Sequence, residues 1–223
     1  LKHNNLESIN FSVPTGNFGD AYAGYIAKKM GLPINKIIIA TNSNDILSKF
    51  FQTGIYKVSK VVPTLSPSMD IQVASNFERL LFECLDFNPS LVTKYMTKLS
   101  THGSFEISKE ILCELNKTFI GVGVNDHITI ERIKSCYSEK NIIIDPHTSV
   151  GLEAACNSNL KELCIVLSTA HPIKFSTAVN KAINITPNLP NKYKNIFSLK
   201  EKYQSMPNDL NEIKNFISIN SSL

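Results

Sequence analysis

The sequence predicts an α/β fold in which a parallel sheet is flanked by helices. Residues 9–13 alternate apolar and polar side chains before Pro14, which is typical of a strand that enters a turn. Residues 20–30 then carry apolar side chains at helical spacing. A β-branched run at residues 36–40 suits a strand that is buried on both faces of a sheet. This order of strand, helix and strand predicts parallel pairing, with helices covering the faces of the sheet.

The rest of the chain continues this alternation around a helical middle. Asn44 is placed to cap a helix over residues 45–52. The apolar spacing then predicts helices over 71–85, 91–100 and 108–117, strands over 119–124, 142–144 and 163–167, and helices over 129–140, near 150–157 and after His171 and Pro172.

The predicted domain organisation is one α/β domain over residues 1–186, with its helical middle at 71–117, followed by a tail over 187–223. The tail is polar and contains prolines, and it closes with a predicted surface helix around residues 209–217.

Composition excludes several function classes. The chain has 223 residues, of which 43% are hydrophobic and 19% charged, with a net charge of +4. The charge is mild and the lysines are scattered, so we expect neither nucleic acid nor a membrane surface as a partner. No apolar run approaches the roughly 18 residues of a membrane-spanning helix. The histidines show no metal-ligand spacing, so we expect no metal site.

The cysteines indicate the compartment. None of them has C-x-x-C spacing, and a dispersed, odd-numbered set is typical of reduced thiols in a cytoplasmic protein. The chain also begins at Leu1 rather than at a methionine, so we expect further sequence upstream. The five cysteines are Cys84, Cys113, Cys136, Cys156 and Cys164.

The turn between the first strand and the first helix is a candidate anion site. The first N–H groups of a helix lack internal partners, and its dipole places partial positive charge there. We expect Gly16 and Gly19 to adopt positive φ and to let the backbone approach an anion, Asn17 to add a donor, and Asp20 to cap the helix or to act as a first-turn acid. The turn matches neither a Walker A loop nor the dinucleotide fingerprint. Spacing alone therefore leaves a simple structural turn equally open.

A longer pattern resembles a known family. Chain segments in order across almost the whole sequence are similar to threonine synthases of the bacterial and fungal type, in their C-terminal part. The segments are PTGNFGD at 14–20, IATN at 39–42, TLSPSMDI at 64–71, SNFERLL at 75–81, DPH at 145–147 and STAHPIKF at 168–175.

This resemblance implies a fold-type II pyridoxal-phosphate enzyme with a tryptophan-synthase-β-like fold, whose N-terminal part is missing from this chain. It implies that Gly16, Asn17, Phe18 and Asp20 hold the phosphate of pyridoxal 5'-phosphate, with Gly19 as a looser addition. It also implies that Thr169 hydrogen-bonds the pyridine nitrogen. A neutral hydroxyl in that place leaves the nitrogen less fully protonated than a carboxylate would.

The implied reaction converts O-phospho-L-homoserine and water to L-threonine and phosphate, the last step of threonine biosynthesis, which makes the enzyme a carbon–oxygen lyase acting on phosphates. The Schiff-base lysine of the family lies in a Phe-Lys-Asp context that this sequence lacks. We therefore expect no catalytic residue in this chain, and we expect the missing N-terminal portion of the enzyme as its partner, in a monomer or a dimer.

Two other functions stay open. A threonine-synthase-like phospholyase would eliminate phosphate without adding water, and would release 2-oxobutyrate instead of threonine. A non-catalytic phosphate-binding module would keep the fold, and its full reading frame would lack the Phe-Lys-Asp lysine.

Several other polar residues have local structural explanations. We expect His171 and His147 to satisfy turns, and Asp145 to cap a helix. Glu78 and Arg79 are expected to form a structural or solvated pair on a helix. A loop with Ser66, Ser68 and Asp70 is dense enough in polar groups either to touch substrate or to cap a helix.

Overall fold

The computed structural model describes residues 7–221 of the chain. These residues divide into two units, with the boundary in the sequence between Asn188 and Leu189. Each unit is described by itself. Within residues 7–221, no helix combines the length and the apolar character needed to cross a membrane.

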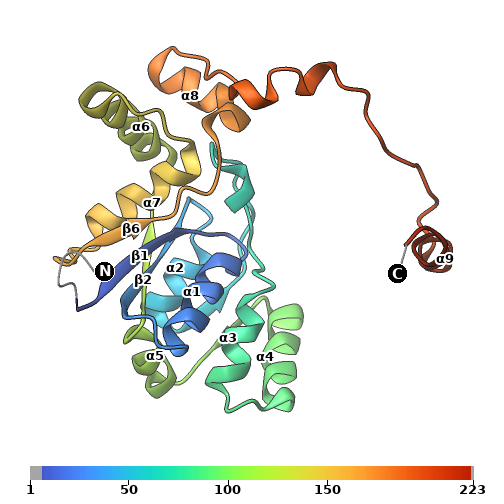
Figure 1. The fold of residues 1–223 in the computed structure, drawn as a ribbon. Helices are drawn as coiled ribbons and strands as arrows, with labels where there is room; N and C mark the ends of the chain where they lie inside the picture. The colour runs from blue at the N-terminus through green and yellow to red at the C-terminus, as the bar shows by residue number, and fades with distance from the viewer. Residues whose placement is uncertain (1–6, 222–223) are drawn as a thin grey trace. The chain divides into compact units, whose positions relative to one another are not determined.

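The first unit is built on a four-stranded sheet whose strands are all parallel, as the sequence predicts (Figure 1). The strand order, β5-β2-β1-β6, places the first strand of the chain beside the last. The carboxyl ends of the strands therefore meet at one edge of the sheet, where open α/β sheets bind ligands. The strands are β1 (Ile9–Pro14), β2 (Ile34–Thr41), β5 (Phe119–Gly123) and β6 (Cys164–Val166).

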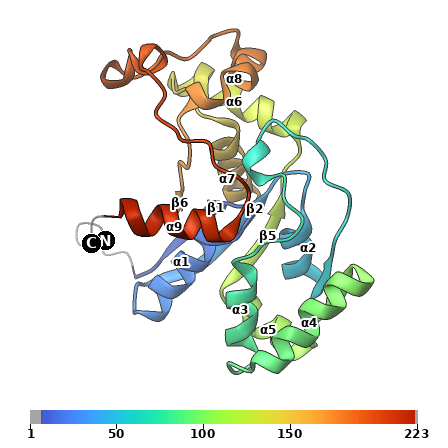
Figure 2. The same ribbon diagram turned by 90° about the vertical axis from the view of Figure 1, so that its right-hand side faces the viewer.

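Alternate residues of β2 face opposite sides of the sheet and belong to two separate apolar clusters. Ile37 and Ile39 join the cluster with α1 (Gly19–Lys29) and α2 (Ile46–Thr53), while Ile38 and Ala40 join the one with α7 (Pro146–Asn157). The helices consequently lie on both faces of the sheet, with α6 and α7 on one and α1 and α2 on the other (Figures 1 and 2). This explains why β2 is an almost unbroken β-branched run.

The helical middle differs from the prediction at two points. A small antiparallel pair, β3 (Ile55–Lys57) and β4 (Ser104–Glu106), is present where none was expected. The helix expected from residue 71 begins only at α3 (Phe77–Cys84). Residues 72–76 are held instead by tertiary hydrogen bonds, from the Tyr56 hydroxyl to the Gln72 carbonyl and from the Asn76 N–H to the Asn17 carbonyl. These tertiary bonds compete with the backbone hydrogen bonds of a helix, and the helix begins after them. Helices α4 (Pro89–His102) and α5 (Lys109–Asn116) follow.

The prediction of a strand over residues 142–144 is wrong. Helix α6 (Asp126–Lys140) ends at Asn141, which has a left-handed backbone, and the chain then runs directly to Asp145, the cap of α7. Residues 141–145 pair with no described strand, and Ile142 is 54% exposed. The edge of the sheet is occupied by β6, which pairs with β1.

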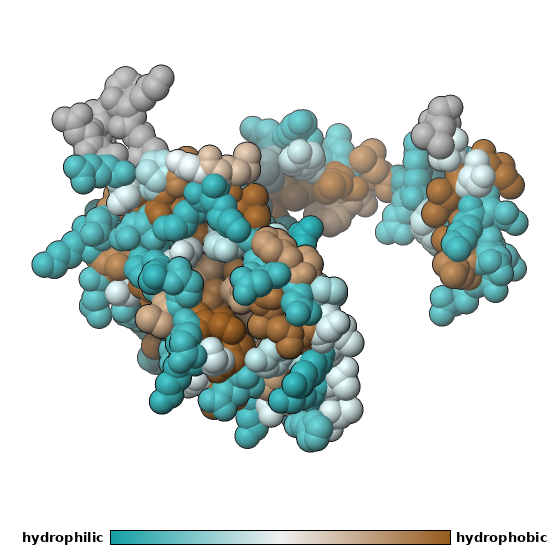
Figure 3. Space-filling model, turned by 90° about the horizontal axis from the view of Figure 1, so that it is seen from below, coloured by the Kyte–Doolittle hydropathy of each residue, from teal (hydrophilic) through white to brown (hydrophobic). Residues whose placement is uncertain are grey.

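The remaining elements are short. Pro172–Phe175 form a 3-10 helix, η2, which continues into α8 (Ser176–Ile183), where the sequence predicts a helix. In the second unit, α9 (Leu210–Asn220) begins after Asp209, whose side chain accepts hydrogen bonds from the N–H groups of Asn211 and Glu212. On the face that Figure 3 shows, apolar side chains gather in patches between hydrophilic ones.

Candidate functional site

The turn between β1 and α1 has a different backbone from the one expected. The positive φ falls on Phe18, at 64°, and not on Gly16 or Gly19, so the expectation for the two glycines is wrong. A left-handed backbone costs a non-glycine residue about 1–2 kcal/mol. The hydroxyl of Thr15 accepts a hydrogen bond from the Phe18 N–H at 3.0 Å, which supports this conformation.

The side chain of Phe18 holds the turn in place. It is fully buried and packs against the rings of Phe51, Phe77 and Phe119, with centroids 5.8 to 6.0 Å apart. Burying such a ring contributes on the order of 2–3 kcal/mol, which offsets the strain of the backbone. Phe18 therefore anchors the turn in the core.

The segment that contains η1 (Pro67–Met69) packs closely against the turn. A Cβ atom on Gly16 would lie 2.9 Å from the Met69 Cα, so only glycine fits at this position. Asn17 accepts hydrogen bonds from Ser75 through Oδ1, at 2.6 Å from the N–H and 3.0 Å from the hydroxyl. Both bonds use the Oδ1 atom of Asn17. Its Nδ2 group takes part in neither of them and can donate a hydrogen bond elsewhere.

The start of α1 has no side-chain cap. Phe18 occupies the cap position, and Asp20 lies in the first turn, so the expectation of a first-turn acid is met while that of a capping role is not. In the described part of the chain, the N–H groups of Gly19 and Asp20 have no protein acceptor. Unpaired N–H groups at the positive end of a helix dipole form a favourable place for an anion.

A cavity of about 290 Å³ opens at this turn. It unites the predicted turn residues with Thr169, which is far away in the sequence; of the candidate residues, Phe18 alone does not line it. Its lining residues are Pro14, Thr15, Gly16, Asn17, Gly19, Asp20, Ser68, Met69, Asn76, His147, Thr169, Ala170 and Lys174.

The sheet brings Thr169 to the cavity. Because β6 pairs in parallel with β1, the residues after both strands emerge at the same edge. The Leu167 N–H extends this pairing by donating to the Ser12 carbonyl at 3.0 Å. Thr169 follows two residues later and is exposed in the cavity. Thr169 and the turn between β1 and α1 therefore lie at the same carboxyl edge of the sheet.

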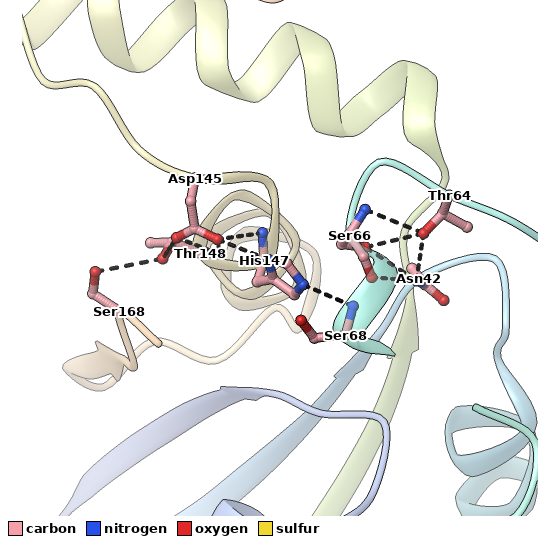
Figure 4. Close-up of polar contacts among 8 residues, drawn as sticks. All are labelled: Asn42, Thr64, Ser66, Ser68, Asp145, His147, Thr148 and Ser168. Atoms are coloured by element: carbon pink, nitrogen blue, oxygen red, sulfur yellow. Dashed lines mark hydrogen bonds and ion pairs between the residues drawn. The ribbon is translucent and has the colours of Figure 1, made fainter. Parts of the chain in front are cut away.

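His147 lies in the first turn of α7, and its side chain contacts Ser68 of the η1 segment (Figure 4). Its Nδ1 is 2.9 Å from the Asp145 carboxylate, and its Nε2 accepts a hydrogen bond from the Ser68 N–H at 3.3 Å. Asp145 also caps α7 by accepting from the N–H groups of His147 and Thr148. Burial opposes ionisation of Asp145, but the hydrogen bonds from His147 and Thr148 outweigh it and hold the pKa of this carboxyl below its usual value.

The polar loop over residues 64–70 separates into two parts. Ser66 and Asp70 belong to an internal network, in which Asn42 Nδ2 donates to Thr64 Oγ1 at 2.7 Å and to Asp70 Oδ1 at 2.8 Å. Ser66 is fully buried there (Figure 4). Ser68 alone of the three lines the cavity. The network therefore shapes the loop, and of its three weighed polar residues Ser68 faces the cavity.

The other weighed residues have structural roles. His171 accepts a hydrogen bond from the Ile173 N–H at 3.2 Å and caps η2, as expected for turn duty. The guanidinium of Arg79 lies over the Tyr22 ring at 5.1 Å, a contact that stabilises the packing of α3 on α1.

Sequence reasoning missed three polar residues that line the cavity, Thr15, Asn76 and Lys174. Asn76 donates through Nδ2 to the Asn17 carbonyl at 3.1 Å, and Lys174 belongs to η2. The signal for Lys174 was its position five residues after Thr169, in the segment that follows β6. Asn76 has no comparable signal, because its contact spans 59 residues of sequence.

Comparisons with known proteins place the chain in one family. The family described as "Threonine synthase, C-terminal" matches residues 148–217. The chain is 42% identical to a threonine synthase of Pseudomonas aeruginosa over 214 residues, which is 95% of this chain and 46% of that protein. It is also 42% identical to the threonine synthase of Saccharomyces cerevisiae, again over 95% of the chain and 46% of the relative. The chain thus spans about half the length of these relatives.

Solved structures agree with the sequence comparison. The structure is similar to a PLP-bound threonine synthase from Brucella melitensis, with a TM-score of 0.89 and 38% identity over 100% of this chain and 48% of that one. A threonine synthase from yeast gives a TM-score of 0.82 at 39% identity, and covers 97% of this chain.

Proposed function

Since the chain belongs to the threonine synthase family and matches its C-terminal part, we propose that it supplies the cofactor cradle of a threonine synthase. The complete enzyme would convert O-phospho-L-homoserine and water to L-threonine and phosphate, with pyridoxal 5'-phosphate as cofactor. The observation that carries this proposal is the cavity in which the start of α1 and Thr169 come together. A binding module for phosphate alone would have no need of the Thr169 segment.

The residues present fit the phosphate group of this cofactor. The uncapped N–H groups of Gly19 and Asp20 and the free Nδ2 of Asn17 are donors that face the cavity side of the turn. Gly16 contributes by admitting the Met69 backbone, and Phe18 by anchoring the turn. The Asp20 carboxylate carries the same charge as a phosphate, so this residue would bind through its N–H.

Thr169 is proposed as the partner of the pyridine nitrogen. Its hydroxyl donates or accepts a single hydrogen bond and carries no charge, so it holds the ring without fixing a full proton on the nitrogen. The bound cofactor supplies the electron sink for the reaction. The role of this chain is then to hold the phosphate at one end of the cavity and the ring at the other.

The proposal assigns the lysine that binds the cofactor covalently to the part of the family that this chain does not span. Two surfaces support a covering partner. Strand β6 pairs within residues 7–221 only with β1, and exposes Leu163 and Ile165 at its edge. An apolar groove of about 320 Å³ lies beside it, lined by Phe11, Ala23, Ala27, Leu32 and Leu167 among others. We propose that the N-terminal portion of the same enzyme covers both in the cytoplasm.

Product analysis of the full-length enzyme, loaded with pyridoxal 5'-phosphate, tests the proposal. Incubation with O-phospho-L-homoserine should release L-threonine and phosphate in equal amounts. Release of 2-oxobutyrate without threonine would identify a phospholyase. Phosphate binding without any product, in a reading frame that lacks a Phe-Lys-Asp lysine, would identify a non-catalytic module.

A second measurement isolates the contribution of this chain. The 223-residue chain alone should bind the cofactor weakly and show no visible absorbance from a covalent lysine adduct, since we place that lysine elsewhere. A strong visible band from this chain alone would overturn the assignment of the lysine.

A further inference from the structure

The cavity contains one cationic side chain that the proposed function does not use. Among the described residues that line it, Lys174 is the only lysine or arginine. His147 also lines it, but both of its ring nitrogens are engaged, by Asp145 and by Ser68. Asp20 contributes negative charge. Within the part of the chain that the structure describes, Lys174 therefore supplies the ammonium that can meet an anion in the cavity.

The backbone at Lys174 is held firmly beside Thr169. The Lys174 N–H donates to the His171 carbonyl at 3.0 Å within η2. The next residue, Phe175, packs on the His147 ring with centroids 4.3 Å apart. Within residues 7–221 the Lys174 ammonium forms no ion pair. Its Nζ lies over the Phe175 ring, 5.9 Å from the ring centroid. The side chain is thus fixed at its base and unpaired at its tip.

The proposed reaction brings two phosphate groups into this cavity. The cofactor phosphate would be held at the start of α1, where the helix dipole offers only about half a positive charge. The substrate then adds a second dianion close to the first, and the repulsion between them requires a separate cation. Lysine is well suited to this task, because its ammonium acts as a compact point charge on a flexible stem.

We propose that Lys174 binds the phosphate group of O-phospho-L-homoserine, an inference that rests on the proposed function. In the loss of phosphate, a proton would pass from Cβ to a base that we place outside this chain, and a double bond would form between Cβ and Cγ. The electron pair of the broken bond between Cγ and the phosphate oxygen would stay on that oxygen. The Lys174 ammonium stabilises the increased charge of the departing phosphate without transferring its proton. The residue therefore sets both substrate recognition and release of the leaving group.

Steady-state kinetics of the cofactor-loaded, full-length enzyme tests this inference. Lys174→Met removes the charge at nearly constant length, Lys174→Arg keeps the charge, and Lys181→Met in α8 is the matched control, since Lys181 is exposed and lies outside the cavity. A lost charged hydrogen bond corresponds to roughly a 10- to 100-fold effect. We expect kcat/KM of Lys174→Met to fall by about that factor, and inorganic phosphate to inhibit it more weakly by a similar factor.

The control and the conservative variant define the outcome. Lys174→Arg should recover most of the activity, Lys181→Met should match the parent enzyme, and cofactor affinity should stay unchanged in all three variants. Unchanged kcat/KM and phosphate inhibition in Lys174→Met would overturn the inference, as would a loss of cofactor affinity in its place.

Calorimetry separates this inference from the proposed function. If the parent enzyme forms no threonine, the proposed function fails, but binding of inorganic phosphate to the cofactor-loaded protein still reports on Lys174. Binding that disappears in Lys174→Met and persists in Lys181→Met supports the residue's role as a phosphate ligand. Equal binding in both variants would contradict it.

Discussion

His147 accepts a hydrogen bond from the Ser68 N–H and so connects the start of α7 to the opposite wall of the cavity. The other ring nitrogen faces the Asp145 carboxylate at 2.9 Å. A ring that donates to the carboxylate through Nδ1 and accepts at Nε2 is a neutral imidazole in one fixed tautomer. The three residues therefore form a chain of hydrogen bonds that positions η1, whose Met69 packs against Gly16.

Replacing His147 should loosen the cavity. His147→Leu leaves the Ser68 N–H without its acceptor and removes one of the several hydrogen bonds of the buried Asp145 carboxylate, and an unsatisfied buried group costs about 1–3 kcal/mol. His147→Gln retains an amide oxygen that can accept from Ser68, so its loss should be smaller. We expect urea unfolding to rank the parent protein above His147→Gln and His147→Leu last. Cofactor titration should give the same order, because the ring acts through the position of η1. Equal stability of the two variants would argue against the bridge.

Gly16→Ala should weaken cofactor binding through the backbone. The added Cβ would lie 2.9 Å from the Met69 Cα and 3.2 Å from its carbonyl carbon, so either the turn or η1 has to move. Gly24→Ala, in α1, is the matched control. Its Cβ would lie 3.4 Å from the Ile37 Cδ1, which is an ordinary van der Waals distance. We expect the dissociation constant for pyridoxal 5'-phosphate to rise at least about tenfold in Gly16→Ala alone, if the shift removes one phosphate contact worth about 1.4 kcal/mol. A Gly16→Ala enzyme with parental affinity would exclude this packing role.

The sheet was predictable because its signals are local. The alternation of β-branched runs with helical spacing predicts each strand that the sheet contains, and parallel pairing follows from the connections. Residues 142–144 have the same local sequence signal as β5. They differ from β5 in that no neighbouring strand in the described structure pairs with them. Likewise, residues 71–76 have helical spacing, but hydrogen bonds to Tyr56 and Asn17 hold them in another conformation. Tertiary competition of this kind is not visible in local sequence.

Part of the cavity lining was predictable from the sequence, but the backbone of the turn was not. Two glycines in a turn predict positive φ by default, and the structure assigns that conformation to Phe18 because its ring can be buried there. Gly16 is needed for a different reason, the close approach of Met69, which lies more than fifty residues away in sequence. Long-range contacts of this kind also explain why Asn76 was not predicted as a lining residue.

Gly121→Ala should destabilise the first unit, because α2 crosses directly over β5 at this residue. A Cβ on Gly121 would lie 2.3 Å from the Ser48 carbonyl oxygen and 2.6 Å from its Cα. Both atoms belong to the backbone of α2 and cannot rotate away, so the cost should reach or exceed the ~1–3 kcal/mol typical of overpacking. Thermal unfolding of Gly121→Ala and Gly123→Ala provides the comparison, since a Cβ on Gly123 would have no neighbour closer than 3.5 Å. Similar midpoints for the two variants would count against the close crossing.

Asp145 should make the free energy of unfolding depend on pH. Its pKa in the folded protein is lowered, because the hydrogen bonds from His147 and Thr148 outweigh the effect of burial. The ionised carboxylate therefore contributes stability above the unfolded pKa of about 3.9, and the contribution disappears as the pH falls through the lower, folded pKa. Asp145→Asn removes this titration. The free energy of unfolding of the parent protein should exceed that of Asp145→Asn at pH 6, and the difference should shrink below about pH 4. A difference that is constant between pH 6 and pH 3 would contradict the assignment.

Cys84 should be the least reactive thiol that the structure describes. Burial, followed by the negative charge of Glu83, raises the pKa of Cys84 to about 12. The reactive form of cysteine is the thiolate, so almost none is present at pH 8, whereas Cys113 and Cys156 are exposed. A disulfide reagent followed by mass spectrometry should label Cys113 and Cys156 rapidly in the native protein, and Cys84 only after unfolding. Cys84→Ala should leave the fast phase of labelling unchanged, and modification of native Cys84 as fast as that of Cys113 would refute its burial.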